Sequence, residues 1–313
     1  MFIGFGGGNI TIVHKAKKHL GQNFLRDSIY LEKIIQAIPN VPCQLVEIGI
    51  GLGDLTQELA KRDSLVAYEV DADLCSLFCK NFPQLVESGR VELINKNVLE
   101  LESRDKSVVP RFYPQTHKSV LTRNLHSKNK KSTASNMGSW LWDKPYMLIS
   151  NLPYYIATHI ITRALRDHMC KYILVMTQKE VAQKFCAQSM QSNFCALSVL
   201  TQVFGKADIL FDVPNTAFEP VPKVTSSVFF IDKYLPYPDF RISEFEMFLK
   251  SAFRAPRKKL GKNLDMFETQ KIFSQLQIPS DARPHEVNTQ QYLEIYKNKE
   301  LKNARQQQKP TIS

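Results

Sequence analysis

The stretch QLVEIGIGLGDLT, residues 44–56, decides the fold of this 313-residue chain. Its first five residues are mostly apolar, and we predict a short buried strand over residues 44–48. Three glycines, each two residues apart, follow: Gly49, Gly51 and Gly53. They predict a tight turn whose backbone approaches a ligand closely. Asp54 then opens a helix predicted over residues 54–62. A strand, a glycine-rich turn and a helix in this order indicate a ligand-binding α/β domain.

The spacing of these glycines argues against a dinucleotide as the ligand. It does not match Gly-x-Gly-x-x-Gly, in which the third glycine allows close helix packing beside a pyrophosphate. Asp54 at the start of the helix is also a poor neighbour for a phosphate. A cofactor without phosphates but with an ammonium group fits the turn better. We therefore assign Gly49 and Gly51 to a cofactor site of that kind.

Strand-like and helix-like runs alternate along the chain. Strands are predicted over residues 64–70, 90–94, 145–150 and 171–177, and helices over residues 28–38, 71–80, 157–168 and 178–188. This alternation indicates an α/β fold, a mostly parallel sheet with helices on both faces. Two last β-like runs, residues 206–213 and 225–232, have no long helix between them and predict an antiparallel hairpin at one edge.

Shifts in composition predict the domains. Residues 1–13 are a predicted N-terminal extension. Residues 14–234 form the α/β domain, with a polar, basic insertion at residues 103–143 that we interpret as a disordered or partly ordered solvated loop. Helical spacing predicts a small all-helical domain over residues 235–301. The Gln-rich residues 302–313 are a predicted disordered tail.

The charge of the chain favours a polyanionic partner. It has 41 Lys and Arg residues against 30 Asp and Glu, a net charge of +11. Each phosphate that a basic side chain neutralises releases counterions, which adds affinity for nucleic acid. No apolar run approaches the ~20 residues that span a bilayer, and the N-terminus lacks signal-peptide features, so we expect a cytoplasmic protein with no membrane partner. The six cysteines form no Cys-x-x-Cys pair, and we expect no metal site.

Two polar residues follow neighbouring predicted strands. Glu69 lies at the end of the strand over residues 64–70, where a carboxylate can accept hydrogen bonds from both hydroxyls of a ribose. Asp71 precedes a helix, and we interpret it as a helix cap. Asn97 lies just past the next strand, and its amide can recognise the edge of an adenine ring. These positions predict a cofactor that contains a nucleoside.

The segment Asn151-Leu152-Pro153-Tyr154-Tyr155 follows the strand over residues 145–150. An Asn side-chain oxygen and a backbone carbonyl held by the proline can accept both N–H groups of an exocyclic amine and aim its lone pair outward. Tyr154 offers an aromatic face to a flipped base, and Tyr155 is assigned to packing. An ordinary tight turn is the alternative, since Asn-x-Pro suits one. By itself the segment supports methylation of an adenine, cytosine or glutamine amino group.

The loop FEPVPKV, residues 218–224, connects the last two predicted strands. Its two prolines stiffen a loop that carries Phe218, which can stack on the base from the side opposite Tyr154. A hydrophobic plug beneath the loop is the alternative for Phe218. Lys223 can reach a phosphate.

Five segments in this order resemble the ribosomal small-subunit RNA adenine dimethyltransferases, the KsgA family. They are KKHLGQNFL (residues 17–25), VEIGIGLGDLT (46–56), NLPYY (151–155), FEPVPKV (218–224) and FRAPRKKL (253–260). The resemblance covers residue 15 to about residue 301. It implies a seven-stranded Rossmann-like class I methyltransferase domain with a small all-helical C-terminal domain. It also implies a monomer that uses S-adenosyl-L-methionine to dimethylate N6 of two adjacent adenosines near the 3′ end of 16S rRNA in the 30S subunit.

The resemblance implies roles for single residues. Contacts to S-adenosylmethionine are implied for Asn23, Leu25, Gly49, Glu69, Asn97 and Asn151. Asn151 would also hold the target amino group, with Tyr154 and Phe218 stacking on the base. The basic run that contains Arg254, Arg257, Lys258 and Lys259 is expected to touch RNA. Two residues differ from the usual ones of the family: Ile50 stands in place of Pro, and Asn97 in place of Asp.

Three other functions remain open at this point. The related erythromycin-resistance methyltransferases perform the same chemistry on 23S rRNA, although residues 253–260 and the run Arg283-Pro284-His285-Glu286 look more like the small-subunit enzymes. A non-catalytic ribosome-assembly or RNA-binding factor is an alternative of another class, and the intact Glu69 and NLPYY segment argue against it. A nicotinamide dehydrogenase is disfavoured by the glycine spacing.

Overall fold

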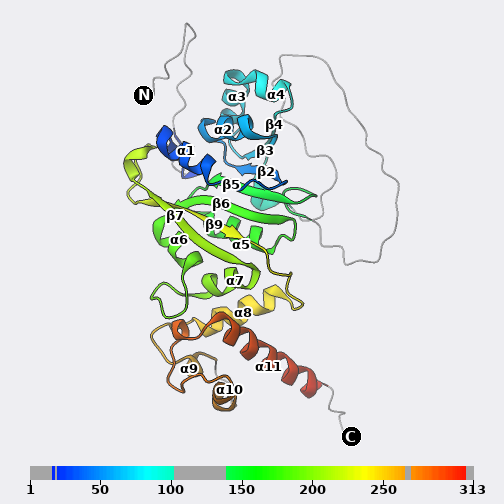
Figure 1. Cartoon of the computed structure of the whole chain (residues 1–313), viewed down its shortest axis with the longest axis vertical. Coiled ribbons are helices and arrows are strands. Elements are labelled where there is room, and N and C mark those ends of the chain that lie inside the picture. Colours follow the sequence, from blue (N-terminus) through cyan, green and yellow to red (C-terminus); the bar gives the residue numbers. More distant parts are fainter. Residues whose placement is uncertain (1–15, 18–19, 102–138, 265–268, 308–313) are drawn as a thin grey trace, which may run out of the picture. The chain divides into compact units, whose positions relative to one another are not determined.

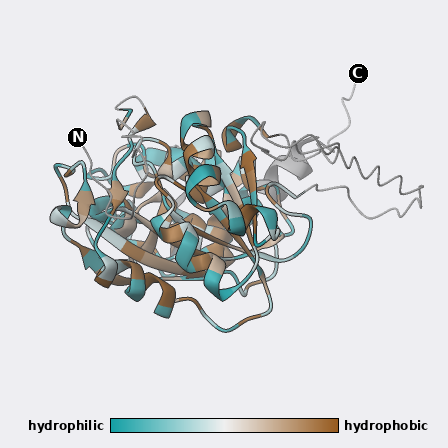
Figure 2. Ribbon diagram, turned by 90° about the horizontal axis from the view of Figure 1, so that it is seen from above, coloured by the Kyte–Doolittle hydropathy of each residue, from teal (hydrophilic) through white to brown (hydrophobic). Residues whose placement is uncertain are grey.

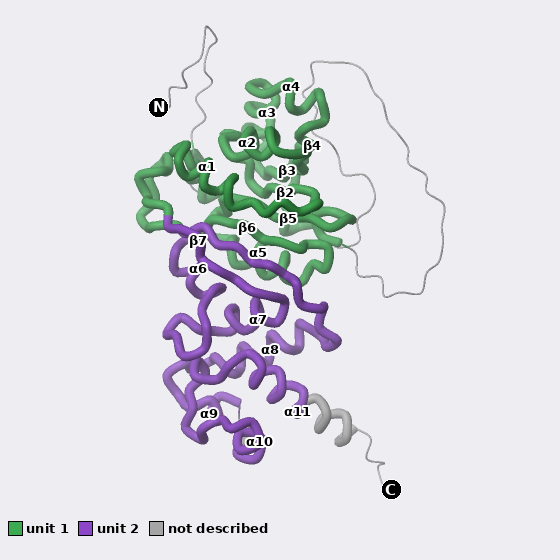
Figure 3. The backbone as a smooth tube through the Cα atoms, in the orientation of Figure 1, with its two compact units in different colours: residues 1–177, 213–226 green, residues 178–212, 227–313 purple. Residues whose placement is uncertain are grey.

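The computed structural model describes residues 16–17, 20–101, 139–264 and 269–307 (Figure 1). The predicted N-terminal extension and residues 103–138 of the predicted insertion lie outside these ranges. The chain divides into two compact units, residues 1–177 with 213–226 and residues 178–212 with 227–313 (Figure 3). These units divide the chain elsewhere than the predicted boundary between residues 234 and 235, which stays a prediction.

A seven-stranded sheet has the strand order β4-β3-β2-β5-β6-β9-β7. Its strands are β2 (Gln44–Ile48), β3 (Leu65–Glu69), β4 (Val91–Asn95), β5 (Tyr146–Asn151), β6 (Cys170–Gln178), β7 (Lys206–Val213) and β9 (Ser226–Asp232). The pairs β2–β3, β2–β5, β3–β4 and β5–β6 are parallel. This topology confirms the predicted α/β class and places β7 and β9 as neighbours at one edge.

Strand β2 lies where the order of the strands reverses, since β3 and β4 follow on one side and β5 and β6 on the other. In such sheets ligands bind beyond the carboxyl ends of the strands at this point. The register aligns Ile48 with Tyr68, and Glu47 with Ile149. The glycine turn after β2 therefore lies at the same sheet edge as Glu69 and Asn151.

Helices surround the strands of the first unit. They are α1 (Ser28–Gln36), α2 (Asp54–Arg62), α3 (Ala72–Asn81), α4 (Pro83–Glu87), α5 (Ala157–Arg166) and the short 3₁₀ turns η2 (Val98–Glu100) and η3 (Asn215–Ala217). The central strands form the core, with Val46, Leu148 and Ile149 fully buried. Brown, hydrophobic residues accordingly run along the strands in Figure 2. A second, two-stranded sheet pairs β1 (Phe24–Leu25) with β8 (Phe218–Glu219) antiparallel.

The second unit holds β7, β9 and the helices α6 (Lys179–Cys186), α7 (Ala196–Phe204), α8 (Ile242–Ala252), α9 (Leu260–Leu264), α10 (Thr269–Gln275), η4 (Pro284–Glu286) and α11 (Thr289–Gln307). Aromatic rings pack between α8 and α11. Phe245 lies 5.1 Å from Tyr296, and Phe248 lies 6.3 Å from Tyr292, between ring centroids. The buried Tyr292 hydroxyl donates to the Pro284 carbonyl at 2.7 Å. No helix in the described ranges is both long and apolar enough to cross a bilayer.

Helices α7 and α11 differ from the sequence prediction, and the short helix α4 was not predicted either. Helix α7 was not predicted, because six of its nine residues are buried and its sequence lacks the polar face that marks an amphipathic helix. Helix α11 continues to Gln307, past the predicted start of the tail at residue 302. Residues 308–313 of that predicted tail lie outside the described ranges.

Arg163 of α5 and its C-cap residue Asp167 bind the chain on the two sides of residues 102–138. The Arg163 guanidinium donates to the carbonyls of Val98 and Leu99 at 3.2 and 3.0 Å, and to that of Leu101. On the other side, the Trp140 amide donates to the Asp167 carboxylate at 2.9 Å. The Trp140 indole N–H donates to the Val98 carbonyl at 2.9 Å, so the chain before residue 102 and the chain after residue 138 also contact each other directly. Trp140 and Leu141, assigned to the insertion by sequence, are therefore buried parts of the core.

Replacing residues 102–138 with a Gly/Ser linker of about eight residues is expected to leave the fold intact, because residues outside the segment hold its two ends. A shorter loop costs less closure entropy, so we expect the melting temperature to stay within roughly 5 °C of wild type. Circular dichroism melts of both proteins measure this. Loss of cooperative unfolding in the shortened chain would show that the segment stabilises the first unit.

Candidate active site

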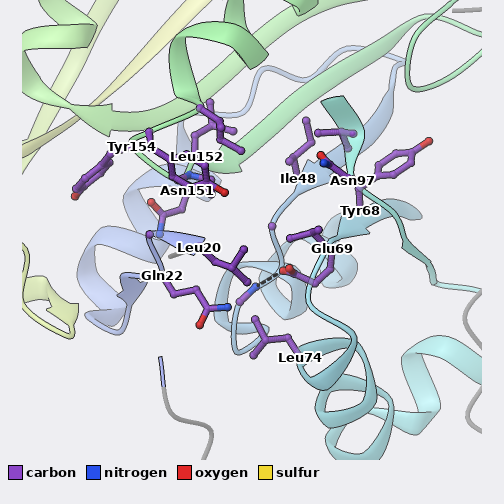
Figure 4. Close-up of a pocket in the computed structure, with 18 of the residues that line it drawn as sticks. Leu20, Gln22, Ile48, Tyr68, Glu69, Leu74, Asn97, Asn151, Leu152 and Tyr154 are labelled. Carbon is purple, nitrogen blue, oxygen red and sulfur yellow. Dashed lines mark hydrogen bonds between the residues drawn. The ribbon is translucent and has the colours of Figure 1, made fainter. Parts of the chain in front are cut away.

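A cavity of about 240 Å³ opens at the carboxyl ends of β2, β3 and β5 (Figure 4). Four parts of the first unit line it: residues 20–24 before α1, the turn after β2, the ends of β3 and β4, and residues 151–156 after β5. It thus brings together most of the predicted cofactor and catalytic residues, namely Asn23, Gly49, Gly51, Glu69, Asn97, Asn151, Leu152, Pro153 and Tyr154. Leu25, Phe218 and the predicted RNA-binding residues do not line it.

The glycine turn lets the backbone approach this cavity. Gly49 has a φ of +80°, and a Cβ atom built on it would meet no atom within 4 Å, so the space beside it is open to a ligand. Gly51, with a φ of +55°, packs against Phe24, whose ring would lie 2.8 Å from an added Cβ atom. Both conformations lie in the left-handed region that side chains rarely adopt. The glycines therefore combine an open ligand face with close packing behind it.

Glu69 ends β3 and is only 5% exposed. Its carboxylate accepts hydrogen bonds from the backbone N–H of Asp71 at 2.9 Å and of Gly51 at 3.4 Å. Burial nevertheless raises the pKa of this carboxyl. Asp71 caps α3, as predicted, by accepting from the backbone N–H of Asp73 at 3.1 Å. Backbone N–H groups of the turn after β2 and of the turn after β3 thus hold the Glu69 carboxylate at the edge of the cavity.

Glu47 is a buried acid that sequence analysis did not assign. It is 1% exposed, and its Oε2 has no hydrogen-bond partner among the described residues. It lines a small cavity of about 30 Å³ together with Leu25, Gly49 and Asn151. Burial, with the nearby charge of Glu69, raises its pKa to about 8. One oxygen of this protonated acid thus lacks a partner, and a bound cation nearby would favour the ionised form.

The substitution Glu47→Gln is expected to flatten the pH dependence of stability. The folded protein keeps the Glu47 proton up to a pKa of about 8, whereas the unfolded chain releases it near 4.5, so rising pH favours unfolding. This cost starts near the unfolded pKa and reaches on the order of 3 kcal/mol at neutral pH.

Urea unfolding at pH 5.5, 6.5 and 7.5 tests this expectation. The free energy of unfolding of Glu47→Gln should rise relative to wild type by about 2 kcal/mol across this range. Glu58→Gln, on the surface of α2, is the control and should follow wild type. Parallel curves for wild type and Glu47→Gln would mean that Glu47 is ionised in the folded protein.

Asn151 ends β5 and faces the cavity. Its Nδ2 donates to the backbone carbonyl of Asn23 at 3.0 Å. That bond leaves Oδ1 as the amide atom that can accept from a ligand, and no donor among the described residues occupies it. The carbonyl of Pro153 accepts from the Ile156 N–H at 3.2 Å. Leu152, just before the proline, also lines the cavity, and its carbonyl accepts no turn or loop hydrogen bond from the backbone of the described residues.

The two tyrosines of this segment differ in their surroundings. The Tyr154 hydroxyl shares a 2.7 Å hydrogen bond with the Ser226 hydroxyl, and burial raises the pKa of Tyr154. Its ring is thus held at the wall of the cavity, as Figure 4 shows. Tyr155 also lines the cavity and is 57% exposed, and its ring lies beside Gly21, where an added Cβ atom would come within 3.0 Å of it.

Other predicted residues lie apart from the cavity or are engaged elsewhere. Phe218 is 3% exposed in β8, where it aligns with Leu25, so its ring is a core residue here rather than an open stacking surface. Lys223 is exposed. The Asn97 side chain caps η2 by accepting from the Leu99 N–H at 3.1 Å, and it donates to Glu100 at 2.8 Å. Its amide is therefore engaged at both ends.

A basic groove of about 820 Å³ lies in the second unit. Its lining includes the predicted Arg257, Lys258 and Lys259, and also Lys262 and Arg283, which sequence analysis did not assign to RNA. Asp281 and Glu286 lie in the same lining, so cations outnumber acids there. Arg254 is exposed but does not line the groove.

The strand order is that of the α/β methyltransferase fold, and its cavity lies at the strand ends that carry Glu69 and Asn151. Two solved structures have the same fold. They are 23S rRNA methyltransferase ErmE (TM-score 0.60, 20% identity, 88% of this chain and 98% of that one) and a dimethyladenosine transferase from Plasmodium falciparum (TM-score 0.64, 18% identity, 89% and 98%).

Sequence comparison identifies the family. The family model described as Ribosomal RNA adenine dimethylase matches residues 13–301. The chain is 50% identical over 90% of both chains to "Ribosomal RNA small subunit methyltransferase A" of Helicobacter hepaticus. It is 42% identical to the protein of the same name from Aliarcobacter butzleri, over 93% of this chain and 98% of that one. The chain therefore belongs to the ribosomal RNA adenine dimethylase family and is an rRNA adenine dimethyltransferase.

Proposed function

We propose that this enzyme uses S-adenosyl-L-methionine to dimethylate N6 of two adjacent adenosines near the 3′ end of 16S rRNA during maturation of the 30S subunit. The observation that carries the proposal is the position of Asn151. Its free Oδ1 and the Leu152 carbonyl lie in one cavity with Glu69. Relatives named for the small ribosomal subunit support the choice of substrate over 23S rRNA. We further propose that the enzyme is cytoplasmic, where its proposed rRNA substrate is found, and that it acts as a monomer, with Glu69 and Asn151 of the same chain lining one cavity.

The residues of the cavity fit this cofactor. When bound, S-adenosylmethionine supplies a methyl group on a positively charged sulfur, and it also carries an ammonium group. The buried Glu69 carboxyl lines the cavity, and the buried Glu47 carboxyl lies in the small cavity next to it, where a bound cation would favour its ionised form. Glu69 would accept from the ribose hydroxyls, and the open space beside Gly49 would receive the amino-acid part.

Asn151 and Leu152 would prepare the adenine amino group. Its lone pair is delocalised into the ring, so it is a weak nucleophile. Oδ1 of Asn151 and the carbonyl of Leu152 would each accept one N–H, localise the lone pair and direct it toward the methyl donor. Tyr154 would hold the flipped base by its ring face. No strong general base is needed, because the methylated ammonium product is acidic and releases its proton to water.

Incubation with radiolabelled S-adenosylmethionine tests the proposed substrate. The enzyme is given 30S subunits, 50S subunits and free rRNA, and the labelled base is mapped. We expect label on N6 of paired adenosines near the 3′ end of 16S rRNA. Label confined to 50S subunits would assign the enzyme to the erythromycin-resistance type. Binding to 30S subunits without any label would indicate a non-catalytic assembly factor.

The basic groove of the second unit would contact rRNA phosphates. Reversing two charges, Lys258→Glu with Lys259→Glu, is expected to weaken 30S binding at least roughly tenfold and to lower the slope of log affinity against log salt by about 2. Filter binding at several salt concentrations measures both values. Lys250→Glu is a matched control, because this exposed lysine on α8 does not line the groove. An unchanged salt slope in the double variant would show that the groove does not bind phosphates.

A further inference from the structure

The chain segment before α1 connects two sides of the cavity. One side carries Glu69 at the end of β3, and the other carries Asn151 at the end of β5. Leu20, Gly21, Gln22 and Asn23 line the cavity, and Phe24 and Leu25 form β1 immediately afterwards. We call residues 20–25 the entry segment. Its C-terminal end is attached to the side of the cavity that carries Asn151, because the Asn23 carbonyl accepts a hydrogen bond from Asn151 Nδ2 and β1 pairs with β8.

Asp71 attaches the N-terminal part of the entry segment to the side of the cavity that carries Glu69. Its Oδ1 accepts from Lys17 Nζ at 2.7 Å, and its Oδ2 accepts from Gln22 Nε2 at 2.9 Å. The Lys17 ammonium also reaches Asp73 at 2.7 Å. In addition, the Lys17 backbone N–H donates to the Gln22 side-chain oxygen at 2.7 Å. Lys17 and Gln22 thus bind each other and the same carboxylate.

This cluster is adjacent to the ribose-binding acid. Asp71 is 4% exposed, and its backbone N–H donates to the Glu69 carboxylate at 2.9 Å. Burial would raise the pKa of Asp71, but its hydrogen bonds with Lys17 and Gln22 outweigh burial and lower it. The hydrogen bond to Asp71 also raises the pKa of Lys17. Both groups therefore carry full charge at neutral pH.

Lys17 is not needed for the ordinary structural role of Asp71. That role is the cap of α3, for which Asp71 requires only its bond to the Asp73 N–H. Lys17 adds a second function to the same carboxylate, because it holds the chain before α1 against the turn between β3 and α3 that follows Glu69. Its side chain is 32% exposed, so the ion pair is only partly screened by solvent.

We propose that Lys17 is a positioning residue for the reaction. Through Asp71 it holds the entry segment across the cavity, so that the Asn23 carbonyl orients the Asn151 amide while Glu69 stays aligned with the cofactor. The ion pair thereby couples cofactor binding to the geometry of the base-binding acceptors. This inference rests on the proposed use of S-adenosylmethionine.

Lys17→Met is expected to raise the KM for S-adenosylmethionine and the Kd for S-adenosylhomocysteine about tenfold, since it removes two charge-assisted hydrogen bonds. The kcat at saturating cofactor should fall less than about threefold, because bound cofactor restores the position of the entry segment. Hydrogen–deuterium exchange of the unliganded protein should show faster exchange at the amides of residues 20–25. Lys17→Arg should restore affinity, because arginine can pair with both carboxylates.

Lys61→Met is the matched control. Lys61 also forms a 2.7 Å ion pair in the first unit, with Glu58, but on the outer surface of α2 away from the cavity. The Lys61→Met variant should bind S-adenosylhomocysteine with the same Kd as wild type. In the double variant Lys17→Met/Asp71→Asn the loss should be clearly smaller than the sum of the two single losses, because Lys17 acts mainly through Asp71.

The outcomes separate the two proposals. If wild type binds neither S-adenosylmethionine nor S-adenosylhomocysteine by calorimetry, the proposed cofactor is wrong. If wild type binds both but Lys17→Met keeps the wild-type KM, Kd and exchange at residues 20–25, the positioning role of Lys17 is overturned. Additive losses in the double variant would likewise overturn it.

Discussion

Replacing Asn151 with alanine is expected to lower the rate of methyl transfer by about a thousandfold or more. The variant loses the side-chain oxygen that accepts one N–H of the target amine, and it also loses the bond to Asn23 that orients this oxygen. Positioned hydrogen-bond partners of a reacting group are typically worth 10²–10³-fold in rate, and misplacement of the base adds to this loss. Asn151 is half-buried, so removing one hydrogen bond should lower the free energy of unfolding by only about 1 kcal/mol.

Single-turnover transfer to 30S subunits at saturating cofactor measures this effect, and a thermal melt verifies folding. Asn193→Ala is the control, since Asn193 also donates a side-chain hydrogen bond, to Gln183, but lies in the second unit outside the cavity. Its rate should equal that of wild type. Wild-type transfer by a folded Asn151→Ala protein would exclude the proposed mechanism.

Glu69→Ala is expected to weaken cofactor binding at least about a hundredfold. Two hydrogen bonds from ribose hydroxyls to a carboxylate would be lost, and bonds to charged groups contribute roughly 1.5–3 kcal/mol each. The backbone N–H groups of Gly51 and Asp71 also lose their acceptor, so the turn after β2 should become less ordered. Unlike the Asn151 variant, this one should regain part of its rate at high cofactor concentration.

Calorimetric titration with S-adenosylhomocysteine measures the expected loss. Glu58→Ala, an exposed change on α2, should bind like wild type. An unchanged dissociation constant for Glu69→Ala would mean that another residue binds the ribose. A proportional loss of thermal stability without bound ligand would instead assign Glu69 a structural role.

The two variants also discriminate between the sides of the cavity. The loss of methyl-transfer rate in the Asn151 variant should persist at saturating cofactor, because Asn151 is proposed to contact the target base. The loss of rate in the Glu69 variant should become smaller, because Glu69 is proposed to contact the cofactor only. Lys17→Met should resemble the Glu69 variant in direction but be smaller, since Lys17 acts through Asp71 and the entry segment.

Local patterns in the sequence determined the α/β class, the glycine turn and the positions of Glu69 and Asn151 at strand ends. These features depend on residues close together in the chain, namely strand and helix periodicity and the backbone preferences of glycine and proline. The carboxyl ends of parallel strands then meet at one edge, so residues placed there by sequence also meet in space. Helix α7 was not predicted, because burial on nearly all sides removes the periodic pattern of apolar and polar residues from its sequence.

Only the tertiary structure decided how the side chains are used. Asn151 is oriented by Asn23, 128 positions away in the chain, and Asp71 binds Lys17 from 54 positions away. Phe218 has the residue type of a stacking group but is buried beside Leu25, and Glu47 is a buried acid that no local pattern distinguishes from a strand residue. Burial and hydrogen bonding between distant segments arise from packing of the whole unit, and for that reason periodicity and motifs do not contain them.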